Sequence, residues 1–121
     1  MTYILVVDDE RTWPRFWEGI VPDGVEILHA WDPIKARNVY DAQRDEIEII
    51  AIDGMMHGPI SNNVVFIRHV RESGYVKLIL AASANWKHNR TMLAAGCDSE
   101  IQHKVPSKTE LREIAPHLFT A

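Results

Sequence analysis

The sequence lacks the features that nucleic-acid-binding, membrane and secreted proteins depend on. Its 121 residues carry 13 Lys and Arg against 17 Asp and Glu, with no basic run that could follow a phosphate backbone. No apolar stretch is long enough to span a bilayer, and the first residues do not have the pattern of a signal peptide. We therefore expect a cytoplasmic protein that contacts neither nucleic acid directly nor a membrane.

Cysteine is also scarce. Cys97 is the only one, so no internal disulfide can form, which fits a reducing compartment. We interpret Cys97 as a small buried apolar side chain, as free cysteines usually are. The six histidines contain no pair at zinc-ligand spacing, which argues against a zinc site.

The chain does have a regular alternation of two hydrophobic patterns. Short continuous apolar runs predict strands that are covered on both faces, whereas the weaker patterns at 25–30 and 100–104 predict strands near or at an edge. Segments with helical spacing lie between these strands. Asp32 before a proline predicts a helix start, Gly74 and Gly96 predict helix ends, and Ser107 with Glu110 predicts a capping box. The predicted strands are 3–7, 25–30, 47–52, 76–82 and 100–104, and the predicted helices are 11–20, 33–43, 61–73, 86–95 and one from 107 that Pro116 kinks or shortens.

Five strands that alternate with five helices predict an α/β fold. Right-handed crossovers in so short a chain favour a flavodoxin-like, doubly wound, five-stranded parallel sheet with strand order 2-1-3-4-5. The sequence contains no internal repeat and no linker, so residues 1–121 are expected to form one domain.

In such a sheet, ligands bind beyond the carboxyl ends of the strands. Asp8 and Asp9 follow the first predicted strand, and Asp53 follows the third. Ser83 follows the fourth strand and Lys104 ends the fifth. Each residue alone has an ordinary explanation as a loop residue or a helix cap, and for Ser83 or Lys104 alone that explanation is favoured. Their joint occurrence at four strand ends predicts a shared pocket, with the three carboxylates on one side and Ser83 and Lys104 on the other.

Three carboxylates in one pocket repel each other unless positive charge compensates them. A hard divalent cation such as Mg²⁺ accepts carboxylate and carbonyl oxygens, and the ammonium of Lys104 adds a second positive charge. A carboxylate can act as a nucleophile, and phosphoryl transfer requires mainly positioning and neutralisation of the phosphoryl oxygens. This set of groups is therefore suited to phosphoryl transfer.

The same five positions, at these separations, resemble the active-site residues of response-regulator receiver domains of two-component signalling, in particular single-domain regulators similar to the chemotaxis regulator. Three segments carry the resemblance, which covers essentially the whole chain: Val6-Val7-Asp8-Asp9-Glu10, Ile52-Asp53-Gly54-Met55-Met56 and Ser83-Ala84. It implies that residues 1–121 are one receiver domain with no output domain attached.

The resemblance implies that Asp53 accepts a phosphoryl group from the phosphohistidine of a sensor histidine kinase or exchanges it with a histidine phosphotransfer protein. Ser83 and Lys104 would each bind a phosphoryl oxygen. The implied ligands of Mg²⁺, or of Mn²⁺ in its place, are Asp8 through water, Asp9, Asp53 and the backbone carbonyl of Met55. The chain would phosphorylate itself and lose the group slowly, without being a multiple-turnover enzyme.

Movement of Ser83 toward the phosphoryl group would alter the surface formed by 86–95, 100–104 and the last helix. This surface would bind a downstream effector protein, and a homodimer through the same surface is an alternative.

Several positions depart from the family pattern. His57 stands where proline is usual, Val105 separates Lys104 from Pro106, and Ile101 replaces the usual aromatic residue. The changed loop at His57 and the inserted Val105 motivate a second hypothesis, a pseudo-receiver that serves only as a protein-interaction module. A Mg²⁺-dependent phosphohydrolase is disfavoured, because no second acid follows Asp53 at two residues and the chain is too short for a substrate-binding insertion. Trp13 lies either at the rim of the site or in ordinary helix packing.

Overall fold

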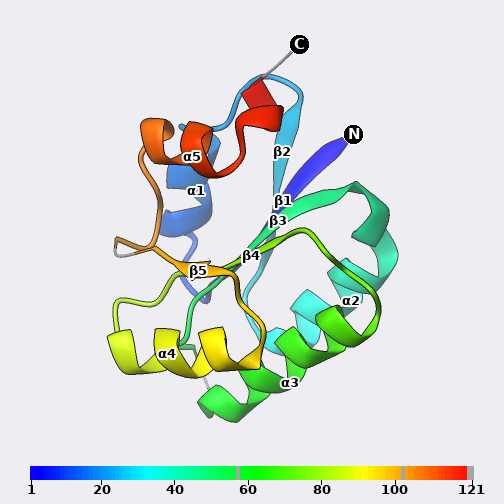
Figure 1. Ribbon diagram of the computed structural model, residues 1–121, viewed down its shortest axis with the longest axis vertical. Coiled ribbons are helices and arrows are strands. Elements are labelled where there is room, and N and C mark those ends of the chain that lie inside the picture. Colours follow the sequence, from blue (N-terminus) through cyan, green and yellow to red (C-terminus); the bar gives the residue numbers. More distant parts are fainter. Residues whose placement is uncertain (57, 102, 120–121) are drawn as a thin grey trace.

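The computed structural model describes residues 1–56, 58–101 and 103–119, and it consists of a central sheet between two layers of helices (Figure 1). All neighbouring strands are parallel, and their order is β2-β1-β3-β4-β5. The predicted fold class and strand order are therefore confirmed. The strands are β1 (Thr2–Val7), β2 (Val25–Ala30), β3 (Ile47–Ile52), β4 (Leu78–Ala81) and β5 (Ser99–Glu100).

The helices lie on both faces of the sheet, with α1 and α5 on one face and α2, α3 and α4 on the other (Figure 1). Their bounds are α1 (Thr12–Glu18), α2 (Pro33–Gln43), α3 (Ile60–Glu72), α4 (Trp86–Ala95) and α5 (Lys108–Ile114), with short 3₁₀ turns at Arg44–Glu46 and Pro116–Phe119.

Each face of the sheet has its own hydrophobic core. On the α1 and α5 face, Trp17 and Leu111 are fully buried against β1, β3 and β4. On the opposite face, Tyr40, Phe66 and Met92 from α2, α3 and α4 pack against alternate residues of the same strands. Burial on both faces explains why these strands appear in the sequence as continuous apolar runs.

The helix termini follow the sequence signals. The Asp32 side chain accepts a hydrogen bond of 2.8 Å from the backbone N–H of Lys35, at the start of α2. Ser107 and Glu110 form the predicted capping box at the start of α5. Gly96 ends α4 with a φ of 134°, which a residue with a side chain rarely adopts. These predictions are confirmed, as is the shortening of α5 before Pro116.

The fifth strand differs from its prediction. We predicted a strand over 100–104, of which position 102 is outside the described residues, but β5 covers only Ser99–Glu100. The backbone N–H of Ile101 still donates to Ala81 at 2.8 Å. His103 and Lys104 then form a turn, and Lys104 has a φ of 63°. β5 is an edge strand that pairs only with β4, and this pairing ends where the chain enters the turn at His103 and Lys104.

The remaining composition-based expectations concern Cys97 and the membrane. Cys97 is buried at the end of α4, and burial raises the pKa of its thiol to about 12, which confirms its interpretation as a packing residue. None of the helices in the described parts of the chain is long and apolar enough to cross a membrane.

Candidate functional site

The register of β1 and β3 brings two of the predicted site residues together. Val7 pairs with Ile52, so the residues that follow these strands, Asp8 and Asp53, leave the sheet side by side. The backbone N–H of Asp53 donates to the Val7 carbonyl at 2.9 Å, which extends the pairing by one residue. On the other side of β1, His29 Nε2 donates to the Asp8 carbonyl at 2.6 Å. The sheet itself thus fixes the backbone of both aspartates.

The carboxylates of Asp8, Asp9 and Asp53 form one cluster. Each offers an oxygen that lies within 4.8 Å of the corresponding oxygen of the other two. Asp8 and Asp53 are buried, and Asp9 is partly exposed. A single hard cation could lie among the three carboxylates, because calcium and magnesium bind carboxylate oxygens at about 2.0–2.6 Å. The donor set therefore fits a magnesium-type cation, as the sequence predicted.

Lys104 reaches this cluster although it lies outside the regular strand. Its Nζ is 3.1 Å from Asp53 Oδ2 and 3.6 Å from Asp8 Oδ2. Burial alone would lower the pKa of Lys104, but the hydrogen bond to Asp53 and the charges of Asp53 and Asp8 raise it. The ammonium therefore carries its charge at neutral pH and offsets part of the repulsion among the carboxylates.

Asp8 is the member of the cluster with a strongly shifted pKa. Burial raises its pKa to about 6, and the neighbouring charges of Asp53 and Asp9 add to this effect. The backbone N–H of Glu10, which donates to Asp8 Oδ1 at 2.9 Å, and the charge of Lys104 act in the opposite direction. Ionised Asp8 is thus unfavourable in the folded protein without a cation.

This shift predicts a pH dependence of stability. The folded chain holds the Asp8 proton more tightly than the unfolded chain, so the contribution of Asp8 to unfolding free energy falls as pH rises from about 4 to about 6. Asp8→Asn removes this unfavourable charge. It should therefore raise the free energy of unfolding, measured by urea denaturation, by on the order of 2 kcal/mol at pH 7 and by clearly less at pH 5. Saturating Mg²⁺ should reduce this difference, because it stabilises the ionised form. An effect of Asp8→Asn that is the same at both pH values would contradict the assignment.

The loop after β3 approaches α4 very closely. A Cβ on Gly54 would lie 2.5 Å from the Cβ of His88, a distance that real Cβ atoms essentially never show. The Nδ1 atom of His88 is buried there, with no hydrogen-bond partner among the described residues. Met55 follows, and its backbone N–H donates to Asp53 Oδ1 at 3.1 Å while its side chain is exposed. His57, the predicted departure in this loop, is outside the described residues.

Gly54→Ala is expected to lower the free energy of unfolding by about 1–3 kcal/mol, the usual cost of overpacking. The clash involves a Cβ fixed to the α4 backbone, so relief requires the loop and the helix to separate. Urea denaturation measures the change, and Gly19→Ala is the matched control. An added Cβ at Gly19, whose φ is −75°, meets nothing closer than 3.4 Å. Equal effects of the two substitutions would show that the Gly54 contact is not tight.

Ser83 is buried one residue further along β4 than Asp53 is along β3. Its Oγ accepts a hydrogen bond of 3.1 Å from the backbone N–H of Asn85, which also caps α4. The side chain of Asn89 makes two hydrogen bonds of 2.9 Å to the Ser83 backbone, one with the N–H and one with the carbonyl. Ser83 is therefore tied to α4, so that a displacement of Ser83 acts directly on this helix.

A second buried asparagine fixes Asp53 in a similar way. Asn63 Nδ2, from α3, donates to the Asp53 carbonyl at 2.7 Å, and it also approaches Met92 Sδ of α4 at 4.0 Å. Sequence analysis missed Asn63 and Asn89. Both stand one turn into a helix that follows a site residue. A polar side chain at this position, on the buried face of the helix, is the signal that could have found them.

Trp13, for which the sequence left two positions open, lies at the rim of the cluster rather than in a core. Lys104 Nζ lies 5.1 Å from the centroid of its ring, and its Nε1 donates to Glu10 at 3.0 Å. Trp13 is therefore part of the surroundings of the site.

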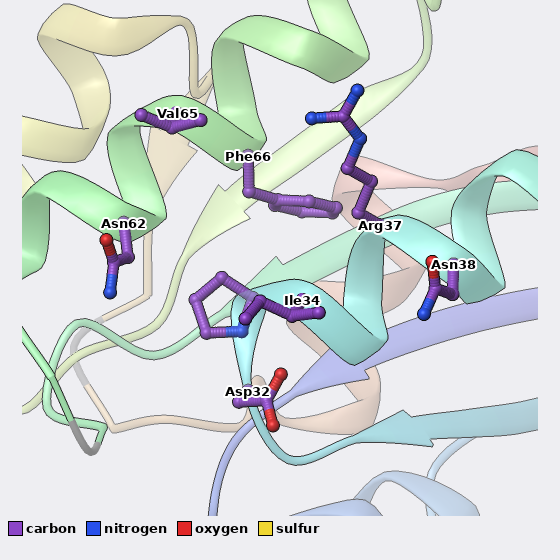
Figure 2. Close-up of a pocket in the computed structure, with 8 residues that line it drawn as sticks. Asp32, Ile34, Arg37, Asn38, Asn62, Val65 and Phe66 are labelled. Carbon is purple, nitrogen blue, oxygen red and sulfur yellow. The ribbon is translucent and has the colours of Figure 1, made fainter.

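A hollow of about 550 Å³ lies elsewhere, between α2 and α3 (Figure 2). Ile34 and Val65, which are exposed, line it together with Arg37 and Asn38 (Figure 2). It contains none of the predicted site residues. The chemistry of the site thus belongs to the open end of the sheet and not to this groove.

The sequence matches no protein-family model and no curated protein, whereas many solved structures share its fold. Response regulator TrrA of Thermotoga maritima, solved with Mg²⁺ and beryllium fluoride, has a TM-score of 0.75 and 22% identity over 98% of this chain and 99% of its own. CheY of Borrelia burgdorferi, solved with CheX, Mg²⁺ and beryllium fluoride, has a TM-score of 0.75 and 18% identity over 99% and 90%. A Francisella receiver domain has a TM-score of 0.70 and 21% identity over 98% and 97%. The fold of this chain is thus that of response-regulator receiver domains.

Proposed function

We propose that this chain is a phosphoacceptor receiver of a two-component phosphorelay. A carboxylate oxygen of Asp53 attacks the phosphorus of a phosphohistidine on a sensor kinase or a phosphotransfer protein. The P–N bond breaks, its electron pair returns to the imidazole nitrogen, and an acyl phosphate forms on Asp53. The observation that carries the proposal is the convergence of Asp8, Asp9 and Asp53 within 4.8 Å of each other, with the Lys104 ammonium 3.1 Å from Asp53.

Each residue of the site has a role in this proposal. Asp9, Asp53 and the Met55 carbonyl would bind Mg²⁺ directly, and Asp8 would act mainly through water. When bound, the cation would supply positive charge that offsets the charge of the transferring phosphoryl group. Lys104 pairs with one phosphoryl oxygen, and Ser83 donates a hydrogen bond to another. The magnesium and beryllium fluoride in the titles of two structural neighbours support this assignment, since they concern proteins of the same fold.

The output of the switch is a protein-binding face. In this proposal, Ser83 moves toward the phosphoryl group and carries α4 with it, because Asn89 ties the two together. The face formed by α4, β5 and α5 then binds a downstream effector in the cytoplasm, and a homodimer through the same face is the alternative. That a neighbour of this fold was solved with the protein CheX supports an output of this kind.

Incubation of the purified chain with Mg²⁺ and acetyl phosphate, followed by intact mass measurement, tests the proposal. One phosphoryl adduct is expected, and EDTA should prevent its formation because chelation removes the cation. No adduct at any Mg²⁺ concentration would instead support a pure interaction module, the alternative suggested by the unusual backbone at Lys104. Continuous release of phosphate at high turnover would indicate a hydrolase.

A further inference from the structure

The backbone at Lys104 does not explain why its side chain lies at the acidic cluster. β5 ends at Glu100, and Lys104 lies in a turn with a φ of 63°, a region that residues with a Cβ avoid. Its side chain is nevertheless only 15% exposed and points into the acidic cluster. Because no regular strand directs this side chain, contacts from another element must hold it.

Trp13 of α1 provides such a contact. Lys104 Nζ lies over its ring, 5.1 Å from the centroid, which is a cation–π distance. The ring is itself restrained, since its Nε1 donates to Glu10 Oε2 at 3.0 Å and Phe16 stacks on it at 5.7 Å with an interplanar angle of 30°. Trp13 belongs to neither of the two core clusters of the described residues. Its contact with Lys104 is therefore not a by-product of core packing.

We infer that Trp13 is a positioning residue that holds the Lys104 ammonium at the mouth of the acidic cluster. The expected effect on phosphorylation rests on the proposed function, whereas the contact between Trp13 and Lys104 does not. When a divalent cation binds, it neutralises the carboxylates of Asp8 and Asp53 and weakens their attraction for the ammonium. The attraction of the indole ring does not depend on those charges. Trp13 thus helps to keep Lys104 within reach of an incoming phosphoryl oxygen in the metal-loaded protein, where the carboxylates attract the ammonium less strongly.

A double-mutant cycle tests this role. Trp13→Leu should slow phosphorylation by acetyl phosphate at saturating Mg²⁺ by about 3- to 10-fold, the range that a partly desolvated cation–π contact supports. Trp13→Phe keeps an aromatic face and should recover most of the rate. In a Lys104→Met background, Trp13→Leu should have no further effect. An equal loss in both backgrounds, or a Phe variant as slow as the Leu variant, would overturn the inference.

Trp31 provides a matched control. It is an exposed tryptophan with a lysine, Lys35, at 5.4 Å from its ring centroid, and neither residue belongs to the cluster. Trp31→Leu should change the phosphorylation rate by less than about 2-fold, since it removes the same type of contact from a lysine without a role in the site.

A second readout separates this inference from the proposed function. Urea denaturation without metal or phosphodonor gives the unfolding equilibrium constants of the same four proteins, namely wild type, Trp13→Leu, Lys104→Met and the double variant. The two substitutions should be coupled by a factor of about 3 or more. If the wild type takes no phosphoryl group, the proposed function fails, and this coupling still decides whether Trp13 holds Lys104. Strict additivity of the two substitutions would refute it.

Discussion

Asp53→Asn is expected to eliminate the phosphoryl adduct, with a loss of at least about 10³-fold in the rate of its formation. The amide cannot form the acyl phosphate, because its oxygen lacks the charge of the carboxylate. The fold should remain, since an asparagine oxygen can still accept the hydrogen bond from the Met55 N–H. Contacts made by the Asp53 backbone, with Val7 and Asn63, are untouched by the substitution.

Intact mass measurement with Mg²⁺ and acetyl phosphate compares Asp53→Asn with Asp23→Asn, which makes the same chemical change at an exposed loop position. The control should form the adduct at the wild-type rate. Urea denaturation of both variants checks that the fold is retained. An adduct that persists in Asp53→Asn would place the acceptor on another residue and would end the assignment of Asp53.

The fold could be predicted because its determinants are local. Continuous apolar strands alternate with capped helices along the chain, and this pattern is compatible with few topologies other than a doubly wound sheet. The caps at Asp32 and Ser107 form as predicted, since a cap depends on residues three positions apart. The extent of β5 was wrong, because an edge strand of a parallel sheet is limited by its single neighbour and by the turn that follows.

The acidic cluster could be predicted because strand ends in a parallel sheet meet at one edge. Asp8 and Asp53 are adjacent through the pairing of Val7 with Ile52, and pairing of β1 with β3 follows from the strand order alone. Lys104 is a different case. Its Nζ lies at the cluster as expected, but it arrives there through a left-handed backbone instead of a strand. The roles of these residues in phosphoryl transfer stay predictions.

The supporting contacts could not be predicted, because they join segments whose relative position is set only in the folded chain. Asn63 and Asn89 have polar side chains on helices, which in the sequence fit a solvated surface equally well. Each hydrogen-bonds the backbone of a site residue only because α3 and α4 pack against the loops that carry Asp53 and Ser83. The need for glycine at position 54 likewise arises from the approach of His88.

Lys104→Met is expected to change two properties of the site in opposite directions. The rate of phosphorylation should fall by about 10²-fold, because a positive charge that would stabilise the phosphoryl oxygens is lost. Mg²⁺ should bind about 3- to 10-fold more tightly, since the ammonium now lies 3.1 Å from Asp53 and 3.6 Å from Asp8 and competes with the cation for the same carboxylates. Methionine has a similar length and no charge, so the packing against Trp13 is largely kept.

The opposite changes in phosphorylation rate and Mg²⁺ affinity distinguish the loss of the ammonium from general damage to the site. Calorimetric titration measures the affinity for Mg²⁺, and intact mass measurement over time gives the rate of phosphorylation of the same protein. General damage to the site would weaken cation binding and phosphorylation together, and that outcome would contradict the proposed position of the ammonium. Lys108→Met, at an exposed position in the first turn of α5, is the control and should change neither property by more than about 2-fold. Tighter Mg²⁺ binding combined with slower phosphorylation in Lys104→Met alone is explained only by a lysine that competes with the metal before transfer and stabilises the phosphoryl group during it.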